Sequence, residues 1–358
     1  MKTKPAGLVL FAKRSKETMN TEAISQPLKA AVDQGIVCGA AYAIIGADVH
    51  EEHYLGWCDD SREHPVVSHL DYDLASLTKV VATATRIFQL LGERTIELED
   101  PVGSFFETSF PDVTVADLLL HDSGLPADLT DVWQYESAAD VWQAVKDSQL
   151  VYPTGSAARY SDLNFIILGK IIEKATGNPL AVEIHKHVLK PLGMHDSGYC
   201  LGNEPFRDRN WFVPTEMTQK RGQVWGSAHD ETAWQLQGCA GHAGLFASLS
   251  DLENFAQMYL NDGRFHDQEI IPKQIAVRLP ELDHFERTLA WIRWTPNRKN
   301  LWHTGFTGPG LGIDLDRRRA LIILTNAVYP KRGNEAWQAA RRAAAAAFFG
   351  GKYREKQA

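Results

Sequence analysis

Ser76 and Lys79 stand three residues apart in the stretch LASLTKVV, residues 74–81. A serine hydroxyl is a poor nucleophile near neutral pH and needs a base within hydrogen-bond reach. Residues i and i+3 of a helix share a face, with Cβ atoms about 5–6 Å apart, so the Lys79 amine can reach the Ser76 hydroxyl. A lysine that is buried or lies beside another cation has a lowered pKa and can act as that base. The same pair also occurs at ordinary helix starts, where the serine caps and the lysine is solvated, but the apolar run at 80–84 favours burial here.

Two further stretches carry groups that suit acyl chemistry. Tyr160 precedes a predicted helix, and from there a phenol can bring a proton-relaying hydroxyl into a cleft. Asp162, two residues later, is a natural N-cap, which explains it without any catalytic role. Far downstream, LWHTGFTGPG (301–310) leads from a strand-like segment into a glycine-rich turn.

That turn offers the second half of an oxyanion hole. Gly305 lets the backbone approach a ligand closely, and the N–H of Phe306 can donate to a developing negative charge. The N–H of Ser76 is the first donor, because the first N–H groups of a helix have no partner within the helix. Trp302 is the best candidate among the tryptophans for a wall of the cleft.

Other polar residues have simpler explanations. His121 ends a predicted helix, where the helix dipole favours a charged histidine; a role in the cleft is the alternative. His242 lies in a glycine-rich turn, which is usually structural, although it can line the cleft. A metal site at residues 229–231 (His-Asp-Glu) is not favoured, because metal ligands must converge from several places. We expect unpaired, buried thiols for the four cysteines, Cys38, Cys58, Cys200 and Cys239.

Hydrophobic periodicity predicts where the elements that position these residues begin and end. Strands are predicted at 38–47, 50–57, 289–294, 310–316 and 319–326. Long helices are predicted at 21–35, 76–93, 250–263 and 334–350, with Ser250 as the N-cap of the third. Between about 93 and 240 the pattern indicates short helices joined by loops, at 114–121, 137–148, 162–177 and 181–193.

Strands near both ends with helices between them predict an α+β architecture. We expect a discontinuous sheet domain, residues 20–92 and 244–350, and a mainly helical domain, residues 93–243.

Composition excludes several classes of function. The chain has 358 residues, and its 37 basic and 45 acidic side chains give a net charge of −8 without a basic run. Nucleic acid is therefore not an expected partner. No stretch reaches the roughly 20 apolar residues of a membrane span. The apolar run at 7–12 is too short for a secretory signal, so we expect a cytoplasmic protein, or an extracellular one if the N-terminus has been trimmed. A monomer is expected, since no long heptad or apolar edge stands out.

In these motifs the chain resembles the penicillin-recognising serine hydrolases, in their class C β-lactamase branch. SxxK is present at Ser76 and Lys79. The Tyr-centred motif, usually YxN, is Tyr160-Ser161-Asp162, and the usual KTG is His303-Thr304-Gly305. LLLHDSGL (118–125) and GHAGLFAS (241–248) are also typical, and the resemblance covers nearly the whole chain.

The resemblance implies a β-lactamase-like fold: an antiparallel sheet flanked by helices, an inserted helical domain, and a site between them. It implies that Ser76 forms an acyl-enzyme, that Lys79 and Tyr160 shuttle its proton, and that the N–H groups of Ser76 and Phe306 hold the oxyanion. Asp162, Trp302 and the 303–305 triplet (His303, Thr304, Gly305) would contact the substrate. No metal or cofactor is implied.

Two departures from the usual motifs bear on the substrate. Asp162 replaces asparagine and favours a charged Lys79, which moves more of the base role to Tyr160. A neutral His303 is a weaker anchor for a carboxylate than a lysine. We therefore favour a D-Ala peptidase or esterase acting on small or peptide-like amides and esters over an efficient β-lactamase. A catalytically idle or slow penicillin-binding or peptide-sensing protein is the alternative.

Overall fold

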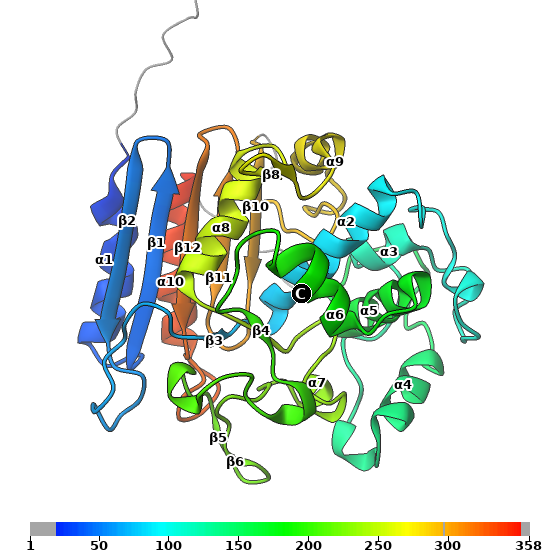
Figure 1. Ribbon diagram of the computed structural model, residues 1–358, viewed down its shortest axis with the longest axis horizontal. Helices are drawn as coiled ribbons and strands as arrows, with labels where there is room; N and C mark the ends of the chain where they lie inside the picture. The colour runs from blue at the N-terminus through cyan, green and yellow to red at the C-terminus, as the bar shows by residue number, and fades with distance from the viewer. Residues whose placement is uncertain (1–18, 296–297, 352–358) are drawn as a thin grey trace, which may run out of the picture.

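A five-stranded antiparallel sheet organises the chain (Figure 1). The structure is a computed structural model that describes residues 19–295 and 298–351. In spatial order the strands are β10 (Asn300–Thr304), β11 (Gly310–Asp314), β12 (Arg319–Thr325), β1 (Gly39–Gly46) and β2 (Val49–Gly56). β1 pairs with β12 from Ala40–Thr325 to Gly46–Arg319. Strands from the two ends of the chain are therefore neighbours within the sheet.

Helices cover both faces of this sheet, which explains why β1 is apolar along almost its whole length. Helices α1 (Thr21–Asp33) and α10 (Glu335–Phe349) pack on one face, against alternate residues such as Tyr42 and Ile44. Helix α8 (Leu249–Leu260) packs on the other face, against Ala43 and Ile45. Successive strand residues point to opposite faces. The side chains of β1 therefore meet a hydrophobic layer on either face of the sheet.

The Ser76 segment forms one continuous helical stretch beside the sheet. It starts as a 3₁₀ turn (Ala75–Leu77), continues as a π-helix (Lys79–Ala84) and becomes helix α2 (Thr85–Gly92). All residues of the π-helical part are buried, Lys79 included. This stretch is therefore a central helix of the core rather than a surface helix with a solvated lysine.

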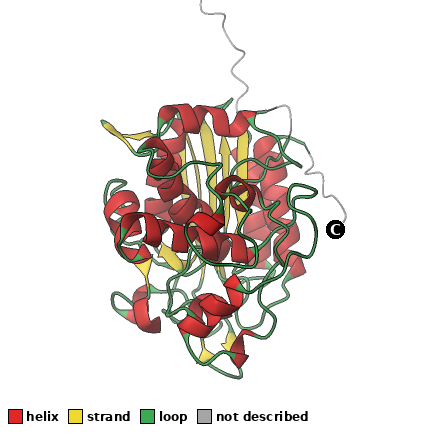
Figure 2. Ribbon diagram, turned by 90° about the vertical axis from the view of Figure 1, so that its right-hand side faces the viewer, coloured by secondary structure: helices red, strands yellow, loops and turns green. Residues whose placement is uncertain are grey.

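The middle of the chain is mainly helical and lies in front of the sheet in Figure 2. Its helices are α3 (Val115–Leu120), α4 (Ala138–Lys146), α5 (Asp162–Thr176), α6 (Leu180–Ile184) with a π-helical continuation (His185–Leu189), and α7 (Glu231–Gln235). Helix α9 (Lys273–Arg278) follows later in the chain. The apolar side chains of α5 join the core beneath α8 and α2.

Short strands and single helical turns complete the fold. One small sheet contains β3 (Tyr72–Asp73), β7 (Leu245–Ala247) and β4 (Gly198–Tyr199). Two hairpins are β5 (Met217–Thr218) with β6 (Gly222–Gln223), and β8 (Arg264–Phe265) with β9 (Gln268–Glu269). Isolated 3₁₀ turns lie at Val102–Ser104, Val132–Gln134, Leu201–Asn203, Arg209–Trp211 and Leu279–Glu281.

The α+β architecture is confirmed, and two local predictions are wrong. Segment 289–294 is not a strand, because Ala290 has a left-handed backbone (φ 69°) and its N–H bonds to Leu119 O; only Ile292 bridges to β10. The N-cap of α8 is Ser248, whose Oγ accepts from the N–H of Asp251, rather than Ser250. The division into domains at residues 93 and 244 stays a prediction.

Two further expectations concern cysteines and membranes. All four cysteines are free, with Cys58 and Cys200 buried and Cys38 and Cys239 half-buried. Among the helices that the structure describes, none has both the length and the apolar character needed to span a bilayer.

Gly241 tests how tightly the segment before β7 packs on α5. A Cβ at this position would lie 2.0 Å from Phe165 O and 3.0 Å from the Gly169 backbone. Gly241→Ala should lower the free energy of unfolding by about 1–3 kcal/mol or more, as overpacking does, measured by urea denaturation. Gly155→Ala is the control, because it meets open space and bears only the strain of a left-handed backbone, about 1 kcal/mol. Equal losses in the two variants would contradict the proposed tight packing.

Candidate active site

The three motifs of the sequence meet in one groove of about 500 Å³. Ser76 and Tyr160 line it from the helical side. The end of β10 and the turn after it contribute residues 303–306. The start of α10 and the preceding loop contribute Arg332, Gly333, Asn334, Trp337, Gln338 and Arg341.

A strained turn presents Ser76. Ala75 has φ 44°, a left-handed conformation that alanine rarely adopts. Asp73 holds this turn, since its Oδ1 accepts the N–H of Ala75 at 2.8 Å and its Oδ2 accepts the N–H of His229 at 2.7 Å. Thr307 Oγ1 also donates to Asp73 O, at 2.6 Å. Asp73 thus ties the nucleophile turn to two distant segments, and sequence reasoning missed it.

Lys79 and Tyr160 both contact the Ser76 hydroxyl. The Lys79 Nζ donates to Ser76 Oγ at 3.0 Å, and the Tyr160 O–H donates to the same atom at 2.6 Å. Lys79 also donates to His242 O at 3.0 Å and forms an ion pair with Asp162 Oδ1 at 2.6 Å. The buried ammonium thus has two hydrogen-bond acceptors and one carboxylate at ion-pair distance.

Asp162 is not the N-cap that the sequence suggests. Helix α5 begins at Asp162 itself, and Ser161 occupies the cap position without capping through its side chain. The Asp162 carboxylate instead turns toward Lys79, because a buried ammonium needs an anionic partner more than a helix end needs a cap.

The charges keep both candidate bases protonated at rest. Burial opposes the charge of Lys79, but the Asp162 carboxylate and Tyr160 outweigh burial and raise the pKa of the lysine. Burial raises the pKa of Tyr160 to about 12, although the nearby Lys79 opposes this shift. The arrangement can therefore relay protons among Ser76, Tyr160, Lys79 and Asp162, but it holds no ready phenolate or free amine.

His121 supports Tyr160 and does not act as a charged helix end. Its ring stacks on the Tyr160 ring at a centroid distance of 4.8 Å. Its Nδ1 accepts the N–H of Ser161 at 3.1 Å, which places the ring proton on Nε2. Burial and the neighbouring cations hold the pKa of His121 well below its usual range. The dipole explanation is thus wrong: the residue is the C-cap of α3, but it is neutral and buried.

His303 is also neutral. Its Nδ1 lies 3.0 Å from Thr304 O, and within the described chain its buried Nε2 has no hydrogen-bond partner. Burial, followed by the charges of Lys79 and Arg287, lowers the pKa of His303 to about 3. His303 therefore supplies no positive charge to the groove. Arg287 lies nearby, with its guanidinium 5.8 Å from the centroid of the Tyr160 ring.

Gly305 lines the groove and also permits a close approach within the protein. A Cβ there would lie 2.4 Å from Leu74 O, so the close approach is between this turn and the segment that carries Ser76. The absence of a side chain lets the end of β10, at Thr304, press against the nucleophile turn. Phe306 is 60 % exposed at the rim, where its ring stacks on His229.

Trp302 does not line the groove, contrary to the expectation. Its ring packs on Trp294 and Phe349 in the core between the sheet and α1 and α10. Adjacent strand residues point to opposite faces, so a strand that turns His303 toward the groove must turn Trp302 away. Trp337 of α10 lines the groove instead, and its indole donates to Gly308 O at 2.9 Å.

The side chains of residues 229–231 have three different partners. His229 bonds to Glu216 at 2.9 Å, and Glu231 bonds to Arg332 at 2.7 Å. Asp230 pairs with the buried His242 at 2.8 Å. Burial opposes the charge of His242, but Asp230 prevails and raises the pKa of this histidine. His242 thus lies behind Lys79, where its carbonyl accepts from the ammonium, and does not line the groove.

Sequence reasoning missed Asp73, Asp230 and Arg287. An aspartate shortly before a candidate nucleophile turn was a visible signal for Asp73. Arg287 had no such signal, because it reaches Tyr160 from a loop 127 residues further along the chain.

The chain matches a protein family and several curated proteins. The family model described as Beta-lactamase matches residues 18–345. Candidate D-alanyl-D-alanine carboxypeptidases of Salmonella agona (strain SL483) and Salmonella typhi are each 28% identical over 311 residues, covering 74% of this chain and 71% of theirs.

Solved structures show the same fold. An octameric penicillin-binding protein homologue from Pyrococcus abyssi superposes with a TM-score of 0.74 at 21% identity, over 93% of this chain and 78% of that one. A class C β-lactamase from Rhodobacter sphaeroides has a TM-score of 0.72 at 16% identity, over 92% and 99% of the two chains. The chain therefore belongs to the Beta-lactamase family of serine hydrolases and has its fold.

Proposed function

We propose that this serine hydrolase forms an acyl-enzyme on Ser76 and removes a C-terminal residue from short peptides, as a D-alanyl-type carboxypeptidase. The observation that carries the proposal is the convergence of Tyr160 and Lys79 on the Ser76 hydroxyl, at 2.6 and 3.0 Å. A nucleophile with two proton-relaying groups in contact is the arrangement that covalent acyl transfer requires.

The protonated resting state determines the order of the proton transfers. Lys79 passes a proton to Asp162, 2.6 Å away, and takes one from Tyr160. The resulting phenolate accepts the proton of Ser76 while Oγ attacks the substrate carbonyl. Tyr160 then gives this proton to the leaving amine, and the earlier transfers reverse. Over acylation, the net proton transfer is therefore from Ser76 to the leaving amine. Water then attacks the acyl-enzyme carbonyl, and one of its protons passes to Ser76 Oγ as the acyl C–O bond breaks and the acid is released.

The N–H groups of Ser76 and Phe306 are our candidates for the oxyanion hole. Both residues line the groove, and the turn at Gly305 lies against Leu74, close to the segment of Ser76. Asp73 supports this role for Ser76, because it fixes the turn from which the N–H points. Two preorganised donors of this kind stabilise the charge that develops on a tetrahedral intermediate.

Arg287 supports a substrate with a free carboxylate. His303 is neutral, so the anchoring charge that a lysine would supply at its position is missing. The Arg287 guanidinium, stacked over Tyr160, provides a permanent cation beside the groove. The names of the Salmonella relatives point to the same substrate class, a peptide ending in D-alanine.

One observation favours a slow or idle penicillin-binding protein as the second candidate. Lys79 and Tyr160 are both protonated at rest, so each acylation needs a prior proton shift within the buried network. A protein that acylates slowly and releases its product slowly would show the same geometry.

The expectation of a monomer stays a prediction, and the homologue from Pyrococcus abyssi is octameric. The cellular compartment stays a prediction as well.

The first experiment separates these functions. The protein is mixed with a penicillin, with p-nitrophenyl acetate and with a peptide ending in D-Ala-D-Ala, and adducts and released D-alanine are followed by mass spectrometry. We expect a transient adduct and D-alanine release, both absent in Ser76→Ala. A long-lived penicillin adduct without D-alanine release would support the slow binder. Turnover retained by Ser76→Ala would show that Ser76 is not the nucleophile.

The same assay tests the carboxylate anchor. Arg287→Gln should raise KM for the peptide more than for the uncharged ester, because only the peptide carries a carboxylate. An equal change for both substrates would mean that Arg287 does not recognise that group.

Tyr160→Phe removes the relaying hydroxyl. We expect acylation to slow by about 10²-fold or more, the usual size of a general-base contribution, in stopped-flow measurements with a chromogenic ester. Tyr152→Phe is the matched control, because its hydroxyl bonds to His121 O and not to Ser76. A rate for Tyr160→Phe close to that of the control would assign the base role to Lys79.

Asp162→Asn should shift the pH dependence of kcat/KM. The carboxylate raises the pKa of both Lys79 and Tyr160, so its removal lowers both values whichever group is the base. The rising limb of the profile should therefore move to lower pH. Asp128→Asn, which leaves the Lys79–Asp162 ion pair intact, serves as the control. An unchanged limb, or a shift to higher pH, would show that Asp162 does not control the titration.

A further inference from the structure

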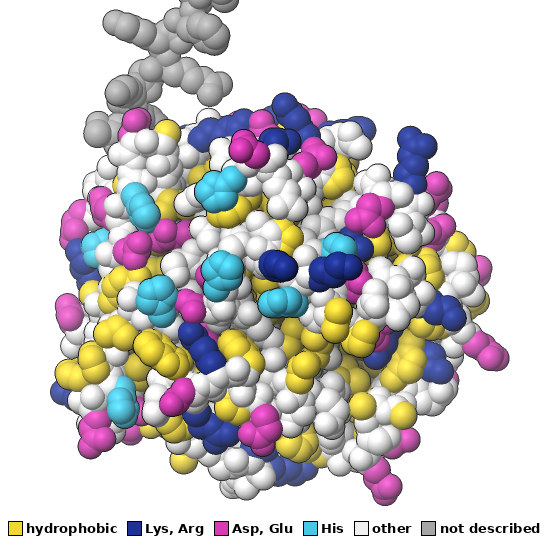
Figure 3. Space-filling view, viewed as in Figure 1, with side chains coloured by type: hydrophobic (Ala, Val, Ile, Leu, Met, Phe, Trp, Pro, Cys, Tyr) yellow, Lys and Arg dark blue, Asp and Glu magenta, His cyan; other side chains and the backbone are white. Residues whose placement is uncertain are grey.

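A second cluster of polar side chains lies between the edge strand β2 and helix α8. His50 Nε2 is 3.3 Å from Glu52 Oε1 and 2.9 Å from Glu253 Oε2. All three atoms lie within 4.8 Å of one another, and in the part of the chain that the structure describes no other three His, Cys, Asp or Glu residues converge in this way. Figure 3 shows histidine and acidic side chains side by side over this region of the surface.

Glu253 is the unusual member of this cluster. Glu253 is only 5 % exposed, and within the described chain its buried Oε1 has no hydrogen-bond partner. An ionised carboxylate in such a place is costly unless a cation compensates for it. The protein side chains alone thus leave this carboxylate short of positive charge.

The other two members are held in suitable positions. His50 and Glu52 are two residues apart on β2, so they face the same side of the strand. The Tyr54 O–H, next along that side, donates to Glu52 Oε2 at 2.5 Å. This leaves Glu52 Oε1 directed at His50. A hydrogen bond that orients a coordinating carboxylate is typical of metal sites in proteins.

We propose that His50, Glu52 and Glu253 bind a divalent transition-metal ion, with Zn²⁺ as the best-suited candidate. One imidazole and two carboxylates are ligands that Zn²⁺ accepts, at about 2.0–2.2 Å from the metal. Bonds of that length in a tetrahedron place ligand atoms about 3.3 Å apart, close to the distances that His50 already makes. Water would fill the fourth position.

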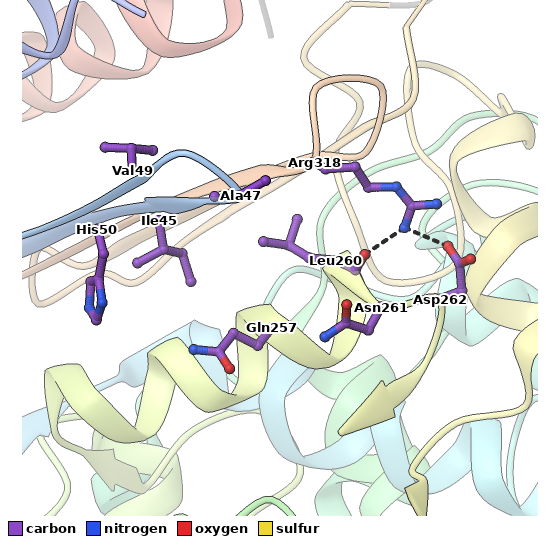
Figure 4. Close-up of a pocket in the computed structure, with 10 residues that line it drawn as sticks. Ile45, Ala47, Val49, His50, Gln257, Leu260, Asn261, Asp262 and Arg318 are labelled. Atoms are coloured by element: carbon purple, nitrogen blue, oxygen red, sulfur yellow. Dashed lines mark hydrogen bonds and ion pairs between the residues drawn. The ribbon is translucent and has the colours of Figure 1, made fainter. Parts of the chain in front are cut away.

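The site is open to solvent on one side and separate from the catalytic groove. A hollow of about 640 Å³ lies beside it, lined by residues of the β1–β2 hairpin and of α8. Figure 4 shows His50 directed from β2 toward α8, on the same side as Gln257. None of the three proposed ligands lines the groove of Ser76. The ion would therefore fasten the edge strand to α8 and take no part in acyl transfer.

Zinc titration of the full chain tests the site. Metal-free protein is titrated with Zn²⁺ by calorimetry near pH 7.5, and the visible absorption of bound Co²⁺ reports the coordination. The test variants are His50→Gln and Glu253→Gln. The matched controls are His53→Gln and Glu51→Gln, which change the same residue types on the opposite face of β2.

We expect one equivalent of Zn²⁺ to bind the wild type and to raise its melting temperature as the zinc concentration rises. The two test variants should bind about 10-fold more weakly or worse, and the controls should bind like the wild type. Binding should weaken at lower pH, because protons compete for the ligands. Absence of binding, or an equal loss in the controls, would overturn the proposal and leave His50 as a hydrogen-bonded bridge between the carboxylates. Hydrolysis by the four variants reports separately on the Ser76 site.

Discussion

The buried ammonium of Lys79 is the interaction on which the rest of the site depends. It is fully shielded from solvent, and a lone charge in that environment would be prohibitively unstable. Its three partners come from three segments: Ser76 from its own helix, Asp162 from the start of α5, and His242 O from the loop before β7. The Lys79 ammonium has all of these partners only when the three segments are in place. The charge used in the proposed chemistry therefore also stabilises the arrangement of the segments around Ser76.

Two small structural features bring the remaining parts to this centre. Asp73 holds the strained turn before Ser76 and also links it to the segment of His229. Gly305 allows the end of β10 to press against Leu74, which immediately precedes that turn. A side chain at Gly305 would separate the sheet from the nucleophile turn. The groove is therefore formed by contacts within the backbone as much as by the side chains that line it.

Electrostatics give the site a particular character. Burial and the neighbouring cations keep His121 and His303 neutral, whereas Asp162 and Tyr160 keep Lys79 charged. Asp230 likewise raises the pKa of His242 behind the lysine, against the effect of burial. The histidine at 303 thus contributes shape but no charge to the groove. Arg332 and Arg341 line the groove, and Arg287 lies 5.8 Å from the centroid of the Tyr160 ring.

The sequence by itself determined the strands near both ends of the chain, the central Ser76 helix and the three motifs that meet in the groove. These features rest on local periodicity and on motif spacing, which a linear chain displays directly. It could not indicate that Trp302 points into the core, because the facing of a strand residue depends on register with its neighbours. The wrong strand at 289–294 has a similar cause, since a contact with Leu119 and a left-handed Ala290 override its apolar pattern. Only the tertiary structure decided the roles of Asp73, Arg287 and the neutral His121, because burial and charge pairing arise between segments that are distant along the chain.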